Sequence, residues 1–332
     1  MTDPGTKAKQ LSTLIEMTAL INSTMDIGEI SRRTTEAATG LTGAETGSLL
    51  LIDPRTGELF FYVALGEKGR ALKEIRLKKG QGIAGWVAEH GTPLIVDDAA
   101  SDPRFFRYAD ERTSFTTKNI LCVPVRTKER TLGVIEAVNK NKGDFDADDM
   151  EILTALANQA AMAIENARLY EEAVTDGLTG LYHHKYFELR LKEEVERAKR
   201  YGHAICMIMI DIDHFKDVND RYGHLEGDRV LEGIAAVLKK TTRLGDTASR
   251  YGGEEFAVIL PHISKDNALA TGERLRQAVE GTDFGGIRIT VSAGISFFDG
   301  TDAGFDYREL IRQADNALYS AKRNGRNRVA AA

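Results

Sequence analysis

Apolar residues in the first half of the chain follow helical and strand-like spacings in turn. They recur every three or four positions over residues 9–22 and 26–39, which predicts two helices, and Asp26 is placed to cap the second. A further helix is predicted over residues 80–90. Runs typical of strands occupy residues 48–53, 58–65, 93–96, 119–126 and 131–139. This order predicts an antiparallel sheet with helices packed on one side.

Residues 148–174 form one long helical pattern without Gly or Pro. Its apolar and small residues step by three and four positions: Leu153, Leu156, Ala160, Ala163, Ala167, Tyr170 and Val174. The stripe has two interpretations, packing on its own domain or a short coiled-coil seam with a second copy. Because the stripe continues well past the last predicted strand, we favour the parallel dimer. Small residues make such a seam easy to shift, which suits a signal relay.

Helices and strands are mixed along the second half. Helices are predicted over residues 185–201, 213–222, 225–241, 265–281 and 307–324. Strands are predicted over residues 204–211, 247–251, 255–260 and 286–296. Residues 204–210 are apolar without a break, which indicates a buried strand. We therefore expect an α+β fold whose sheet is antiparallel at its centre.

Two glycines, Gly252 and Gly253, separate the strands predicted over residues 247–251 and 255–260, which is typical of a β-hairpin. Glycine lacks a Cβ, so the backbone there can adopt positive φ and let a ligand come close. Glu254 and Glu255 follow the turn, and strand alternation sends them to opposite faces. We expect one glutamate to reach into a site and the other to brace the hairpin, against Arg250.

A second group of carboxylates, Asp211 and Asp213, ends the buried strand over residues 204–210. Together with the hairpin glutamates they predict a divalent-metal site, because hard oxygen ligands suit Mg²⁺ or Mn²⁺. A pair of such ions is a common arrangement for nucleotidyl transfer. Asp213 has an alternative use as the cap of the helix that follows, and we favour capping.

Length and composition narrow the class of protein. The chain has 332 residues, which suggests two domains. A net charge of −6 and a pI of about 5.8 argue against a general binder of nucleic acid or anionic membranes. Its apolar runs are shorter than the ~20 residues of a membrane span, and its first residues show no signal-peptide pattern. Cys122 and Cys206 lie in apolar strands, so we expect reduced core residues in a cytoplasmic protein.

The second half, residues 176–332, resembles the GGDEF domain of diguanylate cyclases. The motifs that carry the resemblance lie at residues 176–181, 211–216, 219–220, 222–224, 227–228, 252–256, 321–322 and 325–327. The resemblance implies an enzyme that condenses two GTP into the second messenger cyclic di-GMP and two pyrophosphates, with a palm-like nucleotidyl cyclase sheet. One departure is His183-His184, where the family usually has Asn-Arg. It puts in doubt a family ion pair that involves Asp176.

The resemblance also implies roles for single residues. Asp211 and Glu254, with the carbonyl of Ile212, would hold Mg²⁺ or Mn²⁺, two ions per active site, and Glu254 would help to deprotonate the ribose 3′-hydroxyl. The residues implied at the GTP are His214, Phe215, Lys216, Gly253, Lys322 and Arg326. Lys322 and Arg326 stand four apart, which places them on one face at a helix end.

Asn219 and Asp228 match the guanine-reading pair of the family. A carboxylate accepts from guanine N1–H and the 2-amino group but repels the N1 acceptor of adenine. Asp228 therefore opposes one alternative, a cyclic GMP-AMP synthase, although the residue has another use as a helix N-cap. The second alternative is an inactive receptor for GTP or cyclic di-GMP, which the intact metal and phosphate residues oppose. The residues that match a product-inhibition site are Arg243, Asp246 and Arg274.

The first half, residues 1–164, resembles a GAF domain, a module that binds small ligands or dimerises. The motifs that carry this resemblance lie at residues 80–87, 96–98, 102–105, 123–125 and 133–140. The pattern of cyclic-nucleotide-binding GAF domains is only partly matched, at Asn139-Lys140, Phe145 and Asp148-Asp149. Capping and stapling of the next helix explain the same residues, and we favour this structural interpretation. Bilin and haem are less favoured, since Cys122 lies within a strand and His90 is a lone candidate. The ligand stays unassigned.

The product requires two GTP joined with two-fold symmetry, and one GGDEF domain holds one. We therefore expect a homodimer through the GAF domain and the connecting helix, residues 148–175, which would control how often two GGDEF domains meet. GTP and cyclic di-GMP are the expected partners, without nucleic acid or membrane.

Overall fold

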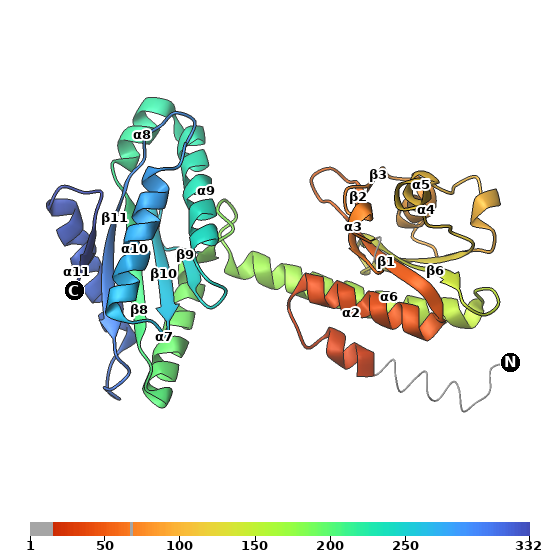
Figure 1. The fold of residues 1–332 in the computed structure, drawn as a ribbon, viewed down its shortest axis with the longest axis horizontal. Coiled ribbons are helices and arrows are strands. Elements are labelled where there is room, and N and C mark those ends of the chain that lie inside the picture. The colour runs from red at the N-terminus through yellow and green to blue at the C-terminus, as the bar shows by residue number, and fades with distance from the viewer. Residues whose placement is uncertain (1–15, 67–68) are drawn as a thin grey trace. The chain divides into compact units, whose positions relative to one another are not determined.

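The computed structural model describes residues 16–66 and 69–332 and divides the chain into two compact units (Figure 1). The boundary falls between Tyr170 and Glu171, inside helix α6 (Ala147–Val174). Each unit contains a six-stranded sheet. The helix expected over residues 9–22 lies partly outside the described residues, and within them residues 16–21 are helical.

The sheet of the first unit is antiparallel throughout, as predicted. Its strand order is β3-β2-β1-β6-β5-β4. The bounds are β1 (Ala44–Ile52), β2 (Leu59–Ala64), β3 (Arg76–Leu77), β4 (Leu94–Val96), β5 (Ile120–Arg126) and β6 (Thr131–Lys140). The helices are α2 (Ile27–Thr42), α3 (Gly69–Leu72), α4 (Gly82–His90), α5 (Tyr108–Thr113) and α6, with the 3₁₀ turn η1 (Ala99–Ser101). Asp26 caps α2 as expected, accepting from the backbone N–H of Glu29.

Helices cover both faces of this sheet, so the expectation of helices on one side is wrong (Figure 1). Leu49 and Ile135 form a pair across β1 and β6 and pack with α2 and α6. The adjacent pair, Leu50 and Val134, packs in the cluster that holds α4. The central strands are apolar at successive positions, which requires cover on both sides.

The predicted seam of α6 is largely part of the first unit's own core. Leu153, Leu156, Ala160, Ala163 and Ala167 are at most 5% exposed and pack with α2 and the sheet. The seam interpretation is therefore wrong for these five residues. The large apolar side chains that α6 leaves exposed are Met162, Leu169 and Tyr170.

The second sheet has the order β12-β11-β8-β10-β9-β7. The bounds are β7 (Tyr182–His183), β8 (Ile205–Ile212), β9 (Thr247–Arg250), β10 (Glu255–Pro261), β11 (Val291–Phe298) and β12 (Val329–Ala331). The antiparallel centre is confirmed, and the edge strands β7 and β12 pair in parallel with β9 and β11. The strand expected from residue 286 begins at Val291, since Gly285 and Gly286 have positive φ and form a turn.

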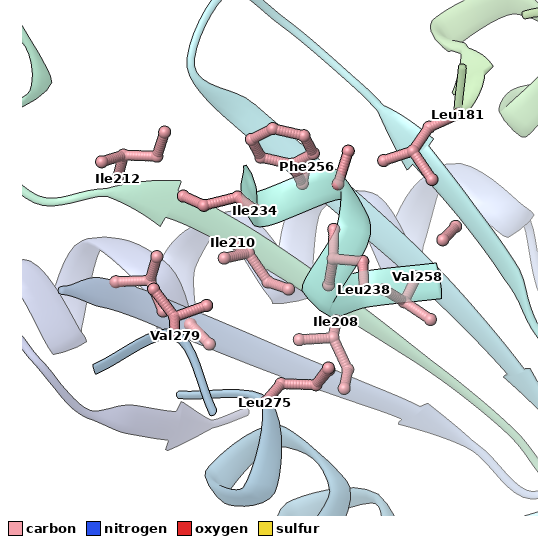
Figure 2. Packing of buried hydrophobic residues seen from close by; sticks show 14 of the residues in the cluster. Leu181, Ile208, Ile210, Ile212, Ile234, Leu238, Phe256, Val258, Leu275 and Val279 are labelled. Atoms are coloured by element: carbon pink, nitrogen blue, oxygen red, sulfur yellow. The ribbon is translucent and has the colours of Figure 1, made fainter. Parts of the chain in front are cut away.

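Strand β8 is buried on both faces, as its apolar run indicates. The helices that cover the sheet are α7 (His184–Tyr201), α8 (Phe215–Tyr222), α9 (His224–Thr241), α10 (Lys265–Glu280) and α11 (Tyr307–Arg323). Figure 2 shows Ile208 and Ile210 of β8 among side chains of α9 and α10, such as Ile234 and Leu275. Met207 and its odd-numbered neighbours face the cluster that holds α7 and α11. In the described part of the chain, no helix has the length and apolar character to cross a membrane.

Candidate active site

Carboxylates converge where β8 and β10 end side by side. The register places Glu255 directly opposite Asp211, so both side chains belong to the face covered by α7 and α11. Glu254 precedes the strand, and its carbonyl accepts from the backbone N–H of Ile212 at 3.4 Å. Asp211 is only 5% exposed. The expected meeting of the strand end and the hairpin is thus present in the fold.

The charges of this group oppose one another. Burial raises the pKa of Asp211, while the ammonium of Lys322, with Nζ 2.7 Å from Oδ2, acts in the opposite direction. Burial and then the negative charge of Asp211 raise the pKa values of both Glu254 and Glu255. Glu255, which has no predicted role in the site, therefore belongs to the same electrostatic group. A cation placed among the three carboxylates would relieve their repulsion.

The two glycines of the β9–β10 hairpin do not adopt the positive φ that we expected. Neither Gly252 nor Gly253 has positive φ. A Cβ on Gly252 would lie 2.6 Å from Oε2 of Glu255, whereas a Cβ on Gly253 would meet nothing within 4 Å. Gly252 therefore makes room for the glutamate, and Gly253 leaves its backbone open on the outside.

Arg250 does not pair with Glu255, so the expected brace is wrong. Its guanidinium donates to the Gly253 carbonyl at 2.8 Å and pairs with Asp176 at 3.2 Å. The ion pair of Asp176 is thus retained despite the His183-His184 departure. Burial raises the pKa of Asp176, but hydrogen bonds from Thr179 and Arg250 outweigh it and the net pKa is lowered.

His183 has a structural role at the start of α7. Its Nδ1 accepts from the backbone N–H of Tyr186 at 3.2 Å, and its Nε2 lies 2.6 Å from the carbonyl of Ala173. One neutral tautomer, with the proton on Nε2, satisfies both contacts. The ring of His184 meets that of Tyr251 edge-on, with centroids 4.3 Å apart. The histidines thus connect the end of α6 and the hairpin to the same helix start.

The predicted phosphate residues lie at the end of α11, but not as one helical face. The helix ends at Arg323, and Arg326 lies beyond it in a turn with φ of 57°. The shared-face expectation is therefore wrong, although the charge of Arg326 still acts to lower the pKa of Asp211. Asp211, Lys322 and Arg326 are consequently neighbours.

Asp213 holds this turn in place and does not cap α8. Its carboxylate accepts from Ser292 Oγ at 2.7 Å, Thr290 Oγ1 at 2.8 Å and the backbone N–H of Asn327 at 3.0 Å. The residue is 6% exposed. The capping expectation is wrong because the buried carboxylate has these donors from β11 and the C-terminal turn.

The first turn of α8 presents backbone N–H groups and polar side chains. His214 occupies the N-cap position with φ of 58°, and its side chain makes no capping bond. Lys216 is exposed, whereas Phe215 is 7% exposed and packs in the hydrophobic core. Phe215 can therefore contact a ligand only through its backbone. The N–H groups of a first helical turn lack helical acceptors and suit an anion.

Asn219 and Asp228 come from the facing helices α8 and α9. A Cβ on Gly227 would lie 2.0 Å from Oδ1 of Asn219, so the amide packs against the glycine next to Asp228. Asp228 is exposed within α9, which begins at His224 with Gly223 as N-cap. The alternative use of Asp228 as an N-cap is therefore wrong.

Arg243 and Asp246 lie in the turn between α9 and β9. Asp246 accepts from the backbone N–H of Arg243 at 2.8 Å, while the Arg243 side chain is 62% exposed. Arg274 of α10 donates to the carbonyl of Thr241 at 3.4 Å, at the end of α9. Both arginines thus lie near the C-terminal end of α9.

The residues present fit a divalent cation by their chemistry. Three carboxylates and a strand-end carbonyl offer only oxygen donors, and burial with neighbouring negative charges raises the pKa values of the carboxylates. Over residues 16–66 and 69–332, no three His, Cys, Asp or Glu side chains form a ready-made metal cluster. Lys322 contacts Asp211 directly in this arrangement.

The residues that partly match the cyclic-nucleotide pattern have structural uses in the first unit. Lys140 forms an ion pair with Asp149 and lies over the ring of Phe145. Asp146 accepts from the backbone N–H of Asp149 at the start of α6. The capping of α6 expected here is confirmed.

Comparisons with known proteins agree with the domain expected in each half of the chain. The family model described as "Diguanylate cyclase, GGDEF domain" matches residues 173–328, and a GAF domain model matches residues 24–165. Diguanylate cyclase A of Treponema denticola is 40% identical over 219 residues, which cover 62% of this chain and 58% of that protein. Diguanylate cyclase DgcP of Pseudomonas aeruginosa is 44% identical over 215 residues, covering 60% of this chain and 32% of that protein. The chain thus spans less than two thirds of the length of these relatives.

A solved structure shows the same fold for the second unit. It is the coiled coil and GGDEF domain of DgcB from Caulobacter crescentus in complex with c-di-GMP. The likeness has a TM-score of 0.50 at 33% identity and covers 56% of this chain and 100% of that one. The chain therefore belongs to the family of GGDEF-domain diguanylate cyclases, with a GAF domain preceding the GGDEF domain.

Proposed function

We propose that this protein condenses two GTP into cyclic di-GMP and two pyrophosphates. The observation that carries the proposal is the convergence of Asp211, Glu254 and Glu255 beside Lys322. In each half-reaction the 3′-oxygen of one GTP forms a bond to the α-phosphorus of the other. The bond from that phosphorus to the β-phosphate oxygen breaks, and pyrophosphate leaves. Because GTP is a cytoplasmic nucleotide, we assign the reaction to the cytoplasm.

Asp211 and Glu254, with the Ile212 carbonyl, would hold two Mg²⁺ or Mn²⁺ ions. Glu255 would add a further carboxylate, which the sequence alone did not identify as a site residue. The ions would supply a lowered pKa for the 3′-hydroxyl and charge for the phosphates. Glu254, whose pKa is raised, would take the proton of the 3′-hydroxyl.

The phosphates would lie between the first turn of α8, with Lys216, and the cations of the C-terminal turn. Arg326 suits bidentate contact with phosphate oxygens. The base would be read by Asn219 and Asp228, which selects guanine and opposes the formation of cyclic GMP-AMP. His214 and the open backbone of Gly253 complete the proposed pocket.

Activity would require a homodimer, because two GTP must face each other. Met162 and Leu169 are exposed on α6 and stand seven residues apart, which is the spacing of a helix–helix seam. We therefore assign dimerisation to these residues in place of the buried stripe. The GAF domain would regulate how often the two catalytic units meet.

Product inhibition would use the turn between α9 and β9. The exposed side chain of Arg243, with Arg274 nearby, offers guanidinium groups to the phosphates of cyclic di-GMP. Asp246 would hold the turn through its bond to the Arg243 backbone.

The direct test is product formation by the purified chain with GTP and Mg²⁺, followed by chromatography and mass spectrometry. Glu254→Gln keeps the shape of the side chain but removes its charge, so we expect the rate to fall by at least ~10²-fold. Glu232→Gln, at an exposed position of α9, is the matched control and should keep full activity. Full activity in Glu254→Gln would refute the assignment of the site.

A further inference from the structure

A cavity of about 450 Å³ lies in the first unit, between its sheet and helices α3 to α5. This volume is in the range of small-molecule pockets. The side chains of Phe61, Phe105, Phe106 and Phe115 line it, so the wall is strongly aromatic. The cavity is separate from the candidate active site, which belongs to the other unit.

The sheet register places a carboxylate in the middle of the cavity wall. Ser48 of β1 and Cys122 of β5 both lie opposite Glu136 of β6, so these three side chains share one face. The flanking positions of β6 on that face are Val134 and Val138, which pack in the apolar cluster. Glu136 is therefore a single carboxylate in an otherwise apolar stretch of strand.

Glu136 is 91% buried, at 9% exposure, and yet it borders the cavity. Its hydrogen bond within the described residues is to Ser48, whose Oγ donates to Oε2 at 2.8 Å. Burial raises the pKa of Glu136, and the hydrogen bond from Ser48 offsets this only in part. A buried carboxylate with one donor is costly unless a ligand supplies another.

Two further carboxylates, Glu45 and Asp110, line the same cavity and are held by neutral donors. The Asn139 amide donates to Glu45 at 2.9 Å, and the Thr117 hydroxyl donates to Asp110 at 2.7 Å. Among the described residues that line the cavity there is no Lys or Arg, and none of the three carboxylates has an ion-pair partner there. The described part of the cavity wall is therefore acidic as well as aromatic.

We propose that this cavity binds a small organic cation that carries an aromatic ring, with its charged nitrogen donating to Glu136. The ring would lie against the phenylalanine side chains, which also attract cations through their faces. An anion, such as the phosphate of a cyclic nucleotide, would instead meet three carboxylates that have no cationic partner among the described residues. The proposal is independent of the GGDEF activity, since it concerns binding to the first unit alone.

Calorimetry on the purified full chain at neutral pH tests the proposal with matched probes. The cations are phenethylamine and tryptamine, and the anions of similar shape are hydrocinnamate and indolepropionate. We expect at least one cation to bind about tenfold or more tightly than its matched anion, as a charge-assisted hydrogen bond provides. Equal or tighter binding of both anions, or no saturable binding of either cation up to about 5 mM, would overturn the proposal.

Variants locate the binding. Glu136→Gln keeps an oxygen for the Ser48 hydroxyl and should weaken cation binding about tenfold or more, while Glu129→Gln, exposed on the β5–β6 turn, should leave it unchanged.

If Glu136→Gln does not fold, Ala64→Lys provides a second test. Ala64 lines the cavity opposite Ser48 and is half-buried, so a lysine there should lower cation affinity and raise that of the matched anion. Cation affinity unchanged in the folded variants would contradict the assignment of Glu136.

Discussion

Asp211 is surrounded by charges of both signs. Lys322 contacts it directly, Arg326 adds a more distant positive charge, and Glu254 and Glu255 oppose it from the hairpin. The net effect raises the pKa of all three carboxylates, so their ionised forms are disfavoured in the folded chain. Since a raised pKa favours the protonated folded state, these groups stabilise the fold at low pH and lose that contribution as pH rises through their folded pKa values.

We therefore predict that Mn²⁺ raises the melting temperature of the chain at pH 8 and that this effect declines as the pH is lowered. The decline should begin above pH ~4, the range in which ordinary carboxylates titrate, because the pKa values of Asp211, Glu254 and Glu255 are raised. Thermal unfolding monitored across pH, with and without Mn²⁺, measures it. Asp211→Asn should abolish most of the Mn²⁺ effect. An effect of Mn²⁺ that is as large at pH 4 as at pH 8 would contradict the raised pKa values.

Single residues also show where sequence reasoning reaches its limit. The carboxylates at the end of β8 and on the hairpin were predicted to meet, because a buried strand and a two-glycine turn leave few alternatives. The role of Asp213 was not predictable, because its donors come from Thr290, Ser292 and Asn327, which are more than 70 positions away. Glu255 was not predicted as a site residue, because alternation gives opposite faces but does not say which face is the site.

At the scale of elements, the hairpin and the α8–α9 pair position the candidate pocket. Gly253 leaves open space where a nucleotide would approach, whereas Gly227 is packed against Asn219. Sequence patterns predicted the boundaries of these elements to within a few residues. The Gly252-Gly253 turn and the regular spacing of apolar residues are signals that lie within each element. The short edge strands β7 and β12 escaped prediction because a few residues carry no period.

Substitutions of Gly253 and Gly227 by alanine give a pair of predictions. Gly253→Ala should fold with an unchanged melting temperature but lose at least about tenfold in kcat/KM for GTP, because its methyl group enters the nucleotide's space. Gly227→Ala should also fold, but it displaces Asn219 and should reduce discrimination against ATP in competition assays. Gly177→Ala, where a Cβ also meets nothing within 4 Å, is the control. Wild-type kinetics in Gly253→Ala would show that the hairpin does not approach GTP.

At the scale of the whole molecule, α6 joins a sensor-type unit to a catalytic-type unit. Its stripe was misread because a helix that packs on its own sheet and a helix in a coiled coil have the same period of apolar residues. Only the burial of residues such as Ala160 in the core distinguishes the two. The two-unit organisation itself was predictable, because each half has its own sequence of strands, helices and motifs.

Cysteine cross-linking tests the dimer. Cys122 and Cys206 are fully buried, so a single exposed cysteine introduced on α6 would react selectively. Leu169→Cys should give a covalent dimer with a short bifunctional maleimide, whereas Ala160→Cys, within the core, should not. If neither Leu169→Cys nor Met162→Cys gives a dimer, the seam on α6 is refuted.

The central claim is that carboxylates from β8 and the hairpin share metal ions beside a bound triphosphate. The most direct measurement is anomalous diffraction from crystals grown with Mn²⁺ and a non-hydrolysable GTP analogue. We predict manganese coordinated by both Asp211 and Glu254, next to the phosphates of the analogue. Manganese bound elsewhere, or an Asp211 and a Glu254 that share no ion in the nucleotide complex, would contradict the account.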